Sequence, residues 1–121
     1  MILHLMTRPQ WEEWRDGGAY DPPSLAAEGF VHCTGDDSLM LTVANRFYAS
    51  EPDDFVVVTL DEARLTGVVR WEAPAHPDGA APTGSEPMFP HVYGPLDRAA
   101  VIGVRRLVRS GTRFVGYEPT T

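Results

Sequence analysis

The run FVVVTL at residues 55–60 constrains the fold more than any other segment, because valines and a threonine follow one another without a charged residue. A strand with one face in water alternates apolar and polar side chains, whereas a continuous apolar run is typical of a strand covered on both faces. We therefore expect residues 55–60 to form a central strand of a sheet.

Further segments that are rich in apolar residues predict strands at residues 2–6, 30–34, 67–73, 88–95, 100–109 and 112–117. The last two segments are expected to form a hairpin through a turn at Ser110 and Gly111. Hairpin connections join antiparallel strands, so this arrangement favours an α+β fold with antiparallel sheets.

The segment after the first strand carries the signal for the start of a helix. Thr7 is followed three residues later by Gln10, which is the pattern of a capping box. Trp11 and Trp14 come next and lie one turn apart, so they would share the buried face. The sequence therefore predicts a first helix that packs its tryptophans against the core.

A second helix is expected to begin near residues 36–38 and to run through residue 50, with Leu39, Val43 and Phe47 as its buried stripe. Between the two helices, residues 20–29 predict a proline-containing connection with a short turn from Ser24. Residues 74–87 are rich in proline, glycine and alanine, which predicts a surface loop.

The length and charge of the chain restrict its class. A chain of 121 residues is the size of one domain, so we expect residues 1–121 to form a single domain. The net charge of −7 and the pI near 4.9 oppose binding to nucleic-acid phosphates, which depends on clustered positive charge. All ten basic residues are arginine, which excludes a Schiff-base lysine and a P-loop lysine.

Features of targeting and secretion are missing from the sequence. No apolar run approaches the roughly 20 residues that a membrane-spanning helix needs. The first residues lack the basic start and long apolar core of a secretory signal, and the single cysteine, Cys33, cannot form an internal disulfide. The default expectation is a cytoplasmic location without membrane partners.

Polar side chains interrupt several predicted strands where a core would hold aliphatic residues. Grouped by the strand face that they share, they are His4, then His32 with Thr34, then Arg70 with Glu72, and then His91 with Tyr93. A buried polar group without a partner costs roughly 1–3 kcal/mol, so several of them together favour a polar cleft. Each one alone would also suit a structural role with an internal hydrogen bond.

The doublet of His32 and Cys33 suggests at first a cysteine–histidine nucleophile pair. Adjacent residues of a strand point to opposite faces, however, so these two side chains cannot work on each other. Free cysteines are among the most buried residue types. We therefore expect Cys33 to pack in the core and to react slowly with thiol reagents.

Four motifs occur in order along the chain: GFVHCT at 29–34, ANRFY at 44–48, RWE at 70–72 and FPHVYGPL at 89–96. Together they resemble the domain-of-unknown-function family 952 over nearly the whole chain. Members of that family are similar in fold to ADP-ribosyltransferases. The resemblance implies two small antiparallel sheets split around a cleft, with helices on the sides.

The same resemblance implies roles for individual residues. In ADP-ribosyltransferases a histidine on the first strand of the cleft holds the adenosine ribose of NAD, and His4 matches it by position. A glutamate steadies the oxocarbenium-like transition state, and Glu72 is the candidate for that carboxylate. The aromatic ring that stacks on nicotinamide would come from Tyr48, Tyr93 or Tyr20.

The related tRNA 2′-phosphotransferases use arginines and a histidine, and Arg46 and Arg70 would be their nearest analogues. Either guanidinium would clamp a pyrophosphate or a carboxylate. His32 and His91 are candidates for proton transfer, because histidine titrates near neutral pH. Thr34 is a candidate for ligand contact.

Three classes of function remain open at this point. The first is a binding domain or enzyme for a nucleotide-like ligand of the NAD or ADP-ribose type, or another anionic small molecule, including a glycosyl or ADP-ribosyl transferase. The second is a metal-dependent hydrolase in which His4, His32 and His91 hold zinc. The third is a non-catalytic module that binds a partner and uses its polar cluster structurally.

Overall fold

The computed structural model describes residues 1–74 and 87–120. Most of the loop predicted at 74–87 therefore lies outside the described residues. The strands of the larger sheet are β1 (Ile2–Thr7), β4 (Phe55–Leu60), β8 (Val101–Ser110) and β9 (Arg113–Pro119), in the order β1-β4-β8-β9. All of its neighbouring strands pair antiparallel.

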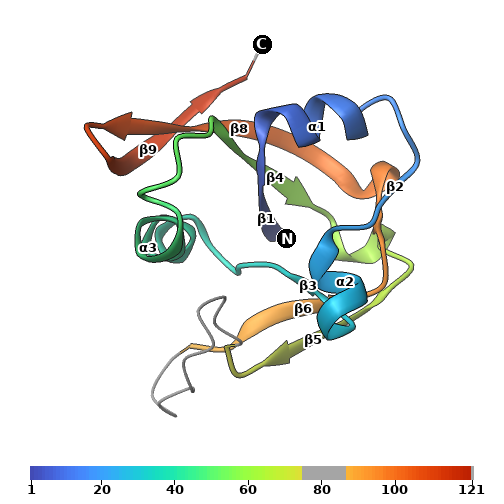
Figure 1. The fold of residues 1–121 in the computed structure, drawn as a ribbon. Helices are drawn as coiled ribbons and strands as arrows, with labels where there is room; N and C mark the ends of the chain where they lie inside the picture. The colour runs from blue at the N-terminus through green and yellow to red at the C-terminus, as the bar shows by residue number, and fades with distance from the viewer. Residues whose placement is uncertain (75–86, 121) are drawn as a thin grey trace.

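A second sheet of three strands lies below the first in Figure 1 and has the order β3-β6-β5. Its strands are β3 (Val31–His32), β6 (Phe89–Tyr93) and β5 (Val68–Glu72), again paired antiparallel. A short ladder joins β2 (Ala19–Tyr20) to β7 (Leu96–Asp97). The α+β class with antiparallel sheets is thus confirmed, and so is the hairpin of β8 and β9.

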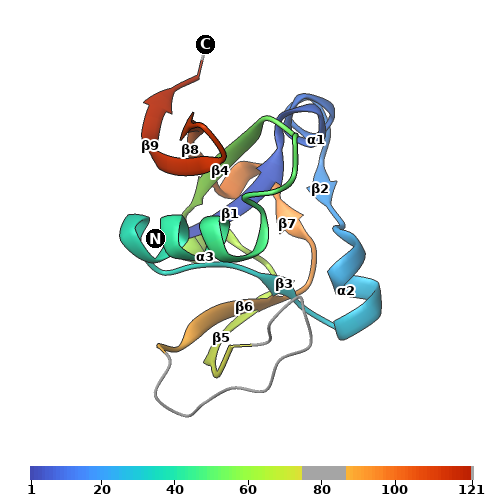
Figure 2. The same ribbon diagram turned by 60° about the vertical axis from the view of Figure 1, so that its left-hand side comes forward.

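Strand β4 is covered on both of its faces, as the continuous apolar run predicts. Helix α1 (Arg8–Trp14) packs its two tryptophans into one core cluster with Val56 and Val58. Helix α3 (Asp37–Phe47) packs into a second cluster with Val57. Figure 2 shows α1 and α3 on different sides of the larger sheet. These three valines are fully buried, which places the centre of the core on β4.

The first helix begins as predicted. The Thr7 hydroxyl accepts a hydrogen bond from the backbone N–H of Gln10 at 3.3 Å, and Gln10 Oε1 accepts one from the backbone N–H of Thr7 at 2.9 Å. This reciprocal pair satisfies two backbone donors that no carbonyl of the helix reaches. The capping box therefore fixes the angle at which the chain leaves β1.

The buried stripe predicted for α3 is wrong by one residue. Met40 and Ala44 are the buried residues of the helix, whereas Leu39, Val43 and Phe47 are only partly buried. The reason is that Met40 and Ala44 pack into the core cluster with residues of β1 and β9, whereas Val43 and Phe47 line a cavity, which Met40 also touches. Asp36 starts this helix by accepting a hydrogen bond from the backbone N–H of Leu39 at 2.7 Å.

The connection predicted at 20–29 is also corrected, because it contains helix α2 (Pro23–Glu28). Proline in the first turn costs no hydrogen bond, since its missing N–H would have no partner there. Gly29 ends the helix with φ 85°, which is the left-handed region that glycine adopts without strain. Two short 3-10 turns, η1 (Glu62–Arg64) and η2 (Arg98–Ala100), precede β5 and β8.

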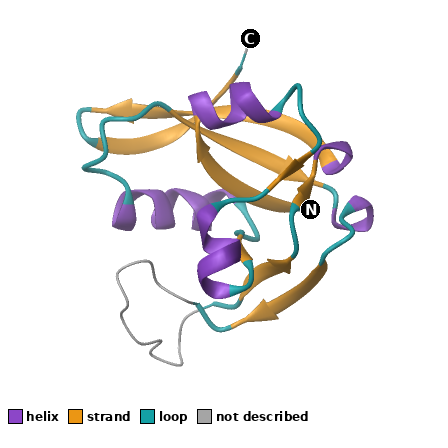
Figure 3. Cartoon of the chain, turned by 45° about the vertical axis from the view of Figure 1, so that its right-hand side comes forward, coloured by secondary structure: helices purple, strands orange, loops and turns teal. Residues whose placement is uncertain are grey.

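The two larger sheets are joined at one point by the backbone. Leu3 of β1 and Thr34, just after β3, exchange two N–H···O bonds of 2.8 Å each and form an isolated antiparallel bridge. Figure 3 shows the strands of the smaller sheet extending below the larger one from this region. The bridge places His4 next to the segment that carries His32 and Thr34.

Candidate functional site

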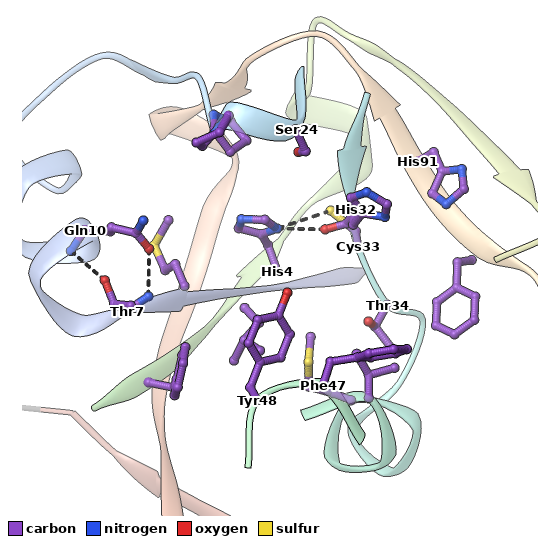
Figure 4. A pocket seen from close by; sticks show the side chains of 18 of the residues that line it. His4, Thr7, Gln10, Ser24, His32, Cys33, Thr34, Phe47, Tyr48 and His91 are labelled. Carbon is purple, nitrogen blue, oxygen red and sulfur yellow. Dashed lines mark hydrogen bonds between the residues drawn. The ribbon is translucent and has the colours of Figure 1, made fainter. Parts of the chain in front are cut away.

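A pocket of about 350 Å³ opens between the two sheets and the first three helices. Figure 4 shows it from close by. Its polar lining includes His4 of β1, His32 and Thr34 around β3, Ser24 of α2, and His91 of β6. The rest of the lining is mostly apolar and aromatic. A cavity of this size, with few polar groups in an apolar wall, is typical of a small-molecule site.

His4 lies at the centre of the pocket and is 7 % exposed. Its Nδ1 donates a hydrogen bond of 2.8 Å to the backbone carbonyl of His32. Burial lowers the pKa of His4 to about 4, so the ring is neutral at neutral pH. With the proton on Nδ1, Nε2 keeps a lone pair, which has no hydrogen-bond partner among the described residues.

His91 is the second buried histidine of the lining and is 3 % exposed. Its Nδ1 lies 3.0 Å from Glu72 Oε1, which also accepts a 2.5 Å hydrogen bond from the hydroxyl of Tyr93. The hydrogen bonds from Tyr93 and His91 lower the pKa of Glu72 and keep it ionised. In a neutral His91 ring, a carboxylate on Nδ1 selects the tautomer in which Nε2 is the acceptor.

Phe30 and His32 enclose the ring of His91. Phe30 stacks on His91 with 4.2 Å between ring centroids, and His32 meets it edge-on at 5.6 Å. His32 Nε2 lies 2.5 Å from a carboxylate oxygen of Glu28, at the end of α2. These contacts hold two histidine rings side by side on paired positions of β3 and β6.

Thr34 contributes a hydroxyl that is almost completely buried, with 4 % of the residue exposed. Its backbone is committed to the bridge with Leu3, whereas its hydroxyl has no hydrogen-bond partner among the described residues. Figure 4 shows the Tyr48 hydroxyl directed toward His4 from the opposite wall. The pocket thus presents both hydroxyl groups and imidazole nitrogens.

Cys33 packs in the core cluster and touches the pocket, as expected for a small buried residue. Its Sγ lies 4.0 Å from His4 Nδ1, whose proton is already given to the carbonyl of His32. Burial raises the pKa of the thiol, so the thiolate does not form at neutral pH. The geometry therefore leaves Cys33 without a base to activate it.

Comparison with known proteins identifies the family. The family model of DUF952, a protein of unknown function, matches residues 5–104. The chain belongs to the DUF952 family. The crystal structure of protein CC0527 from Caulobacter crescentus is similar to it, with a TM-score of 0.68 and 22% identity over 93% of this chain and 90% of that one. A double mutant of CC0527 gives 0.67 and 21% over the same shares.

The likeness between this DUF952 chain and CC0527 concerns the fold alone. A comparison with curated proteins gave no match. Neither comparison tests the similarity to ADP-ribosyltransferases, which stays a prediction. Among the described residues of the chain, no helix is long and apolar enough to cross a membrane.

The structure brings half of the predicted site residues of this DUF952 protein into the pocket lining, namely His4, His32, Thr34 and His91. Glu72 and Tyr93 are not part of the described lining. Glu72 contacts the lining residue His91, and Tyr93 donates a hydrogen bond to Glu72. Arg70 is exposed over the ring of Tyr93, at 5.3 Å. The register pairs Arg70 of β5 with His91 of β6, but Arg70 is not among the described residues that line the pocket, so its part in the site stays a prediction.

Arg46 lies outside the pocket as well. Its side chain is exposed on α3 and sits 5.0 Å from the ring of Phe47. Because the helix is rotated by one residue from the predicted orientation, Phe47 turns to the pocket and Arg46 turns away. The predicted arginine clamp for a pyrophosphate is absent from the described lining.

The three-histidine metal site finds no support in the geometry. Among residues 1–74 and 87–120, no group of three histidine, cysteine, aspartate or glutamate side chains is placed to hold an ion. Nδ1 of His4 and Nδ1 of His91 are each taken up by an internal acceptor, the His32 carbonyl and Glu72. Nε2 of His32 is paired with Glu28.

Several pocket residues were not predicted as site residues from the sequence. Gln10, Ser24, Glu51 and Phe89 come from four separate segments and meet only through the tertiary fold. Of the tyrosines weighed for an aromatic contact, Tyr20 and Tyr48 line the pocket and Tyr93 does not. The signal that would have placed Ser24 is the proline pair before it, which is typical of a helix start.

Proposed function

We propose that this DUF952 protein binds a small organic molecule in the pocket between its sheets and that His91, oriented by Glu72, transfers a proton to or from that molecule. The observation that carries the proposal is the state of two buried histidines, His4 and His91. Each has Nδ1 held by an internal acceptor, so each leaves Nε2 for the pocket. Buried polar atoms without partners are costly, which favours a ligand as their partner.

The pair of His91 and Glu72 supports general acid–base chemistry. A carboxylate on Nδ1 holds the ring in one orientation and stabilises the imidazolium that forms when Nε2 accepts a proton. Covalent catalysis has less support, because the thiol of Cys33 stays protonated and the chain has no lysine. The proposed step is therefore removal of a proton from an O–H or N–H group of the ligand, or of a water beside it.

A narrower form of the proposal is the NAD or ADP-ribose ligand, and the transferase reaction, that the family resemblance implies. It is favoured by the position of His4 on the first strand and by Tyr48 and Tyr20 in the lining. It is opposed by the positions of Arg46 and Arg70, which leave a pyrophosphate without a guanidinium clamp. The pocket suits the nucleoside part of such a ligand better than its diphosphate.

The first experiment is a thermal-shift panel that contains NAD, ADP-ribose, adenosine, nicotinamide and small aromatic compounds. A ligand present at 100 times its Kd stabilises the folded state by about 2.7 kcal/mol, which is a readily visible shift for a domain of this size. We expect at least one compound to raise the midpoint. A panel without any shift would favour the partner-binding alternative.

The second experiment uses His4→Asn and Glu118→Gln on the compound that binds. The amide of the substituted asparagine would place a donor near the position of Nδ1, so the bond to the His32 carbonyl is kept while the Nε2 acceptor is lost. We expect affinity to fall at least about tenfold, the loss of one well-formed hydrogen bond to a buried partner. Glu118 lies on β9 away from the pocket, and its variant should bind normally. Unchanged affinity in His4→Asn would contradict the proposal.

A further inference from the structure

The described pocket lining carries a negative charge, whereas a site for anions carries positive charge. Among the described lining residues, Glu51 is the one aspartate, glutamate, lysine or arginine side chain. None of the ten arginines lines the pocket, and the sequence has no lysine. Residues 75–86, which the structure does not describe, contain neither arginine nor lysine in their sequence. The electrostatic character of the lining therefore favours a positive group over a negative one.

Arg109 binds the main chain around Glu51 rather than its carboxylate. Arg109 donates hydrogen bonds to the backbone carbonyls of Ala49, Glu51 and Asp53 and lies 4.1 Å over the ring of Phe114. Within residues 1–74 and 87–120, the carboxylate of Glu51 takes part in no ion pair. The main chain of Glu51 is thus held by Arg109, and its exposed carboxylate has no ion-pair partner among the described residues.

The central polar groups of the pocket also select for a hydrogen-bond donor. His4 is neutral at neutral pH, because burial lowers its pKa to about 4. Its Nε2 can therefore accept a hydrogen bond but cannot donate one. His91 has its Nδ1 held in a similar way, by Glu72. A carboxylate or phosphate oxygen facing the Nε2 lone pair of His4 would be repelled, whereas an O–H or N–H group would be bound.

Aromatic rings make up much of the pocket lining to which Glu51 belongs. Tyr20 of β2 and Tyr48, just after α3, are among them. So are Phe47 and Phe55, over which Arg46 and Arg109 lie at 5.0 and 5.9 Å. The negative faces of such rings attract cations, by about 0.5–1 kcal/mol at exposed sites and more where water is excluded. Burial raises the pKa of the Tyr48 hydroxyl, and the negative charge of Glu51 raises it further.

We infer that the ligand of this pocket is a small aromatic amine, with its ammonium group at Glu51 and a hydroxyl or N–H group of its ring on Nε2 of His4. This inference rests on the proposed function and names its substrate class. The cavity of about 350 Å³ accommodates a single ring with a short chain. Burial of the ring among tyrosine and phenylalanine side chains supplies the apolar part of the binding free energy.

Three compounds that share a phenol ring and differ in charge test the inference: tyramine, 4-ethylphenol and 4-hydroxyphenylacetate. Each is titrated into ¹⁵N-labelled protein, and the amide signals of Thr34 and His91 report binding in the pocket. We expect tyramine to bind about fivefold more tightly than 4-ethylphenol, which corresponds to one partly exposed charge pair. The carboxylate compound should bind most weakly.

Substitution of Glu51 separates charge from shape. In Glu51→Gln the affinity for tyramine should fall to that for 4-ethylphenol, while the affinity for 4-ethylphenol stays unchanged. Glu118→Gln, which removes an acidic group outside the pocket, should leave all three affinities as they are. Agreement of both variants with these expectations would support the assignment of the ammonium to Glu51.

Two results would overturn the inference. If 4-hydroxyphenylacetate binds in the pocket as tightly as tyramine, the pocket does not select for positive charge, although the proposed function would stand. If none of the three compounds shifts the pocket amides at millimolar concentration, the aromatic-amine class is wrong. The broader ligand panel then decides separately whether the pocket binds small molecules at all.

Discussion

The buried imidazole of His4 makes the stability of this protein depend on pH in a defined window. The change that tests this is His4→Asn, which removes the titrating ring and keeps a donor for the His32 carbonyl. In the folded chain, burial lowers the pKa of His4 to about 4, whereas in the unfolded chain the ring titrates near its ordinary value of 6.5. Between these two values the unfolded chain binds a proton that the folded chain does not.

The sign and the size follow from this difference. Above pH 6.5 the ring is neutral in both states and has no effect on the pH dependence of stability. As the pH falls below 6.5, protonation favours the unfolded chain, so stability is lost until the pH reaches about 4. The loss is about 2 kcal/mol between pH 7 and pH 5, and about 3 kcal/mol below pH 4.

Urea unfolding at pH 7 and pH 5 measures the effect in both proteins. Asp37 and Glu72 also have lowered pKa values, through hydrogen bonds from Arg105 and from Tyr93, but these groups are the same in both proteins and cancel in the comparison. We expect the free energy of unfolding to fall by about 2 kcal/mol more in the natural chain than in His4→Asn. An equal fall in both, within about 0.5 kcal/mol, would refute the buried neutral histidine.

Three further predictions concern single groups. The pKa of Glu72 is lowered by its hydrogen bond from Tyr93, so Tyr93→Phe should raise it toward its ordinary value, as seen by carboxyl ¹³C NMR; an unchanged titration would show that the bond does not form in solution. Gly29→Ala should lower the free energy of unfolding by about 1 kcal/mol, because alanine is strained at φ 85° even though space is open there. An unchanged urea midpoint would argue against the left-handed end of helix α2. Cys33 should stay unmodified by a thiol reagent in the native protein and react fully in urea; rapid native labelling would mean an exposed thiolate.

The alternation of strand residues is the most dependable guide that the sequence offers. It predicts Val92 in the core and puts His91 and Tyr93 together on the other face, and both placements hold. The reason is that a period of two leaves only two possible orientations, and one of them buries the aliphatic side chain. The burial of His4 follows on the same grounds.

Helices give less certain information because their faces are separated by smaller rotations. The apolar residues of α3 fit a stripe through Val43 and Phe47 as well as one through Met40 and Ala44, and only the position of the sheets decides between them. That choice also decides whether Arg46 reaches the pocket. Helix α2 cannot be predicted from periodicity, because it has six residues and buries none of them.

The bridge between Leu3 and Thr34 has a mechanical consequence for the pocket. It ties the edge of the larger sheet to the smaller one beside His4, so the two sheets cannot move apart there without breaking two backbone hydrogen bonds. The pocket wall at His4 and Thr34 therefore keeps its width. A bulkier ligand would need movement of lining residues on other elements, such as Ser24 of α2 or Phe89 of β6. The bridged wall therefore limits the size of the ligand, and tolerance for substituents depends on the lining residues that the bridge does not hold.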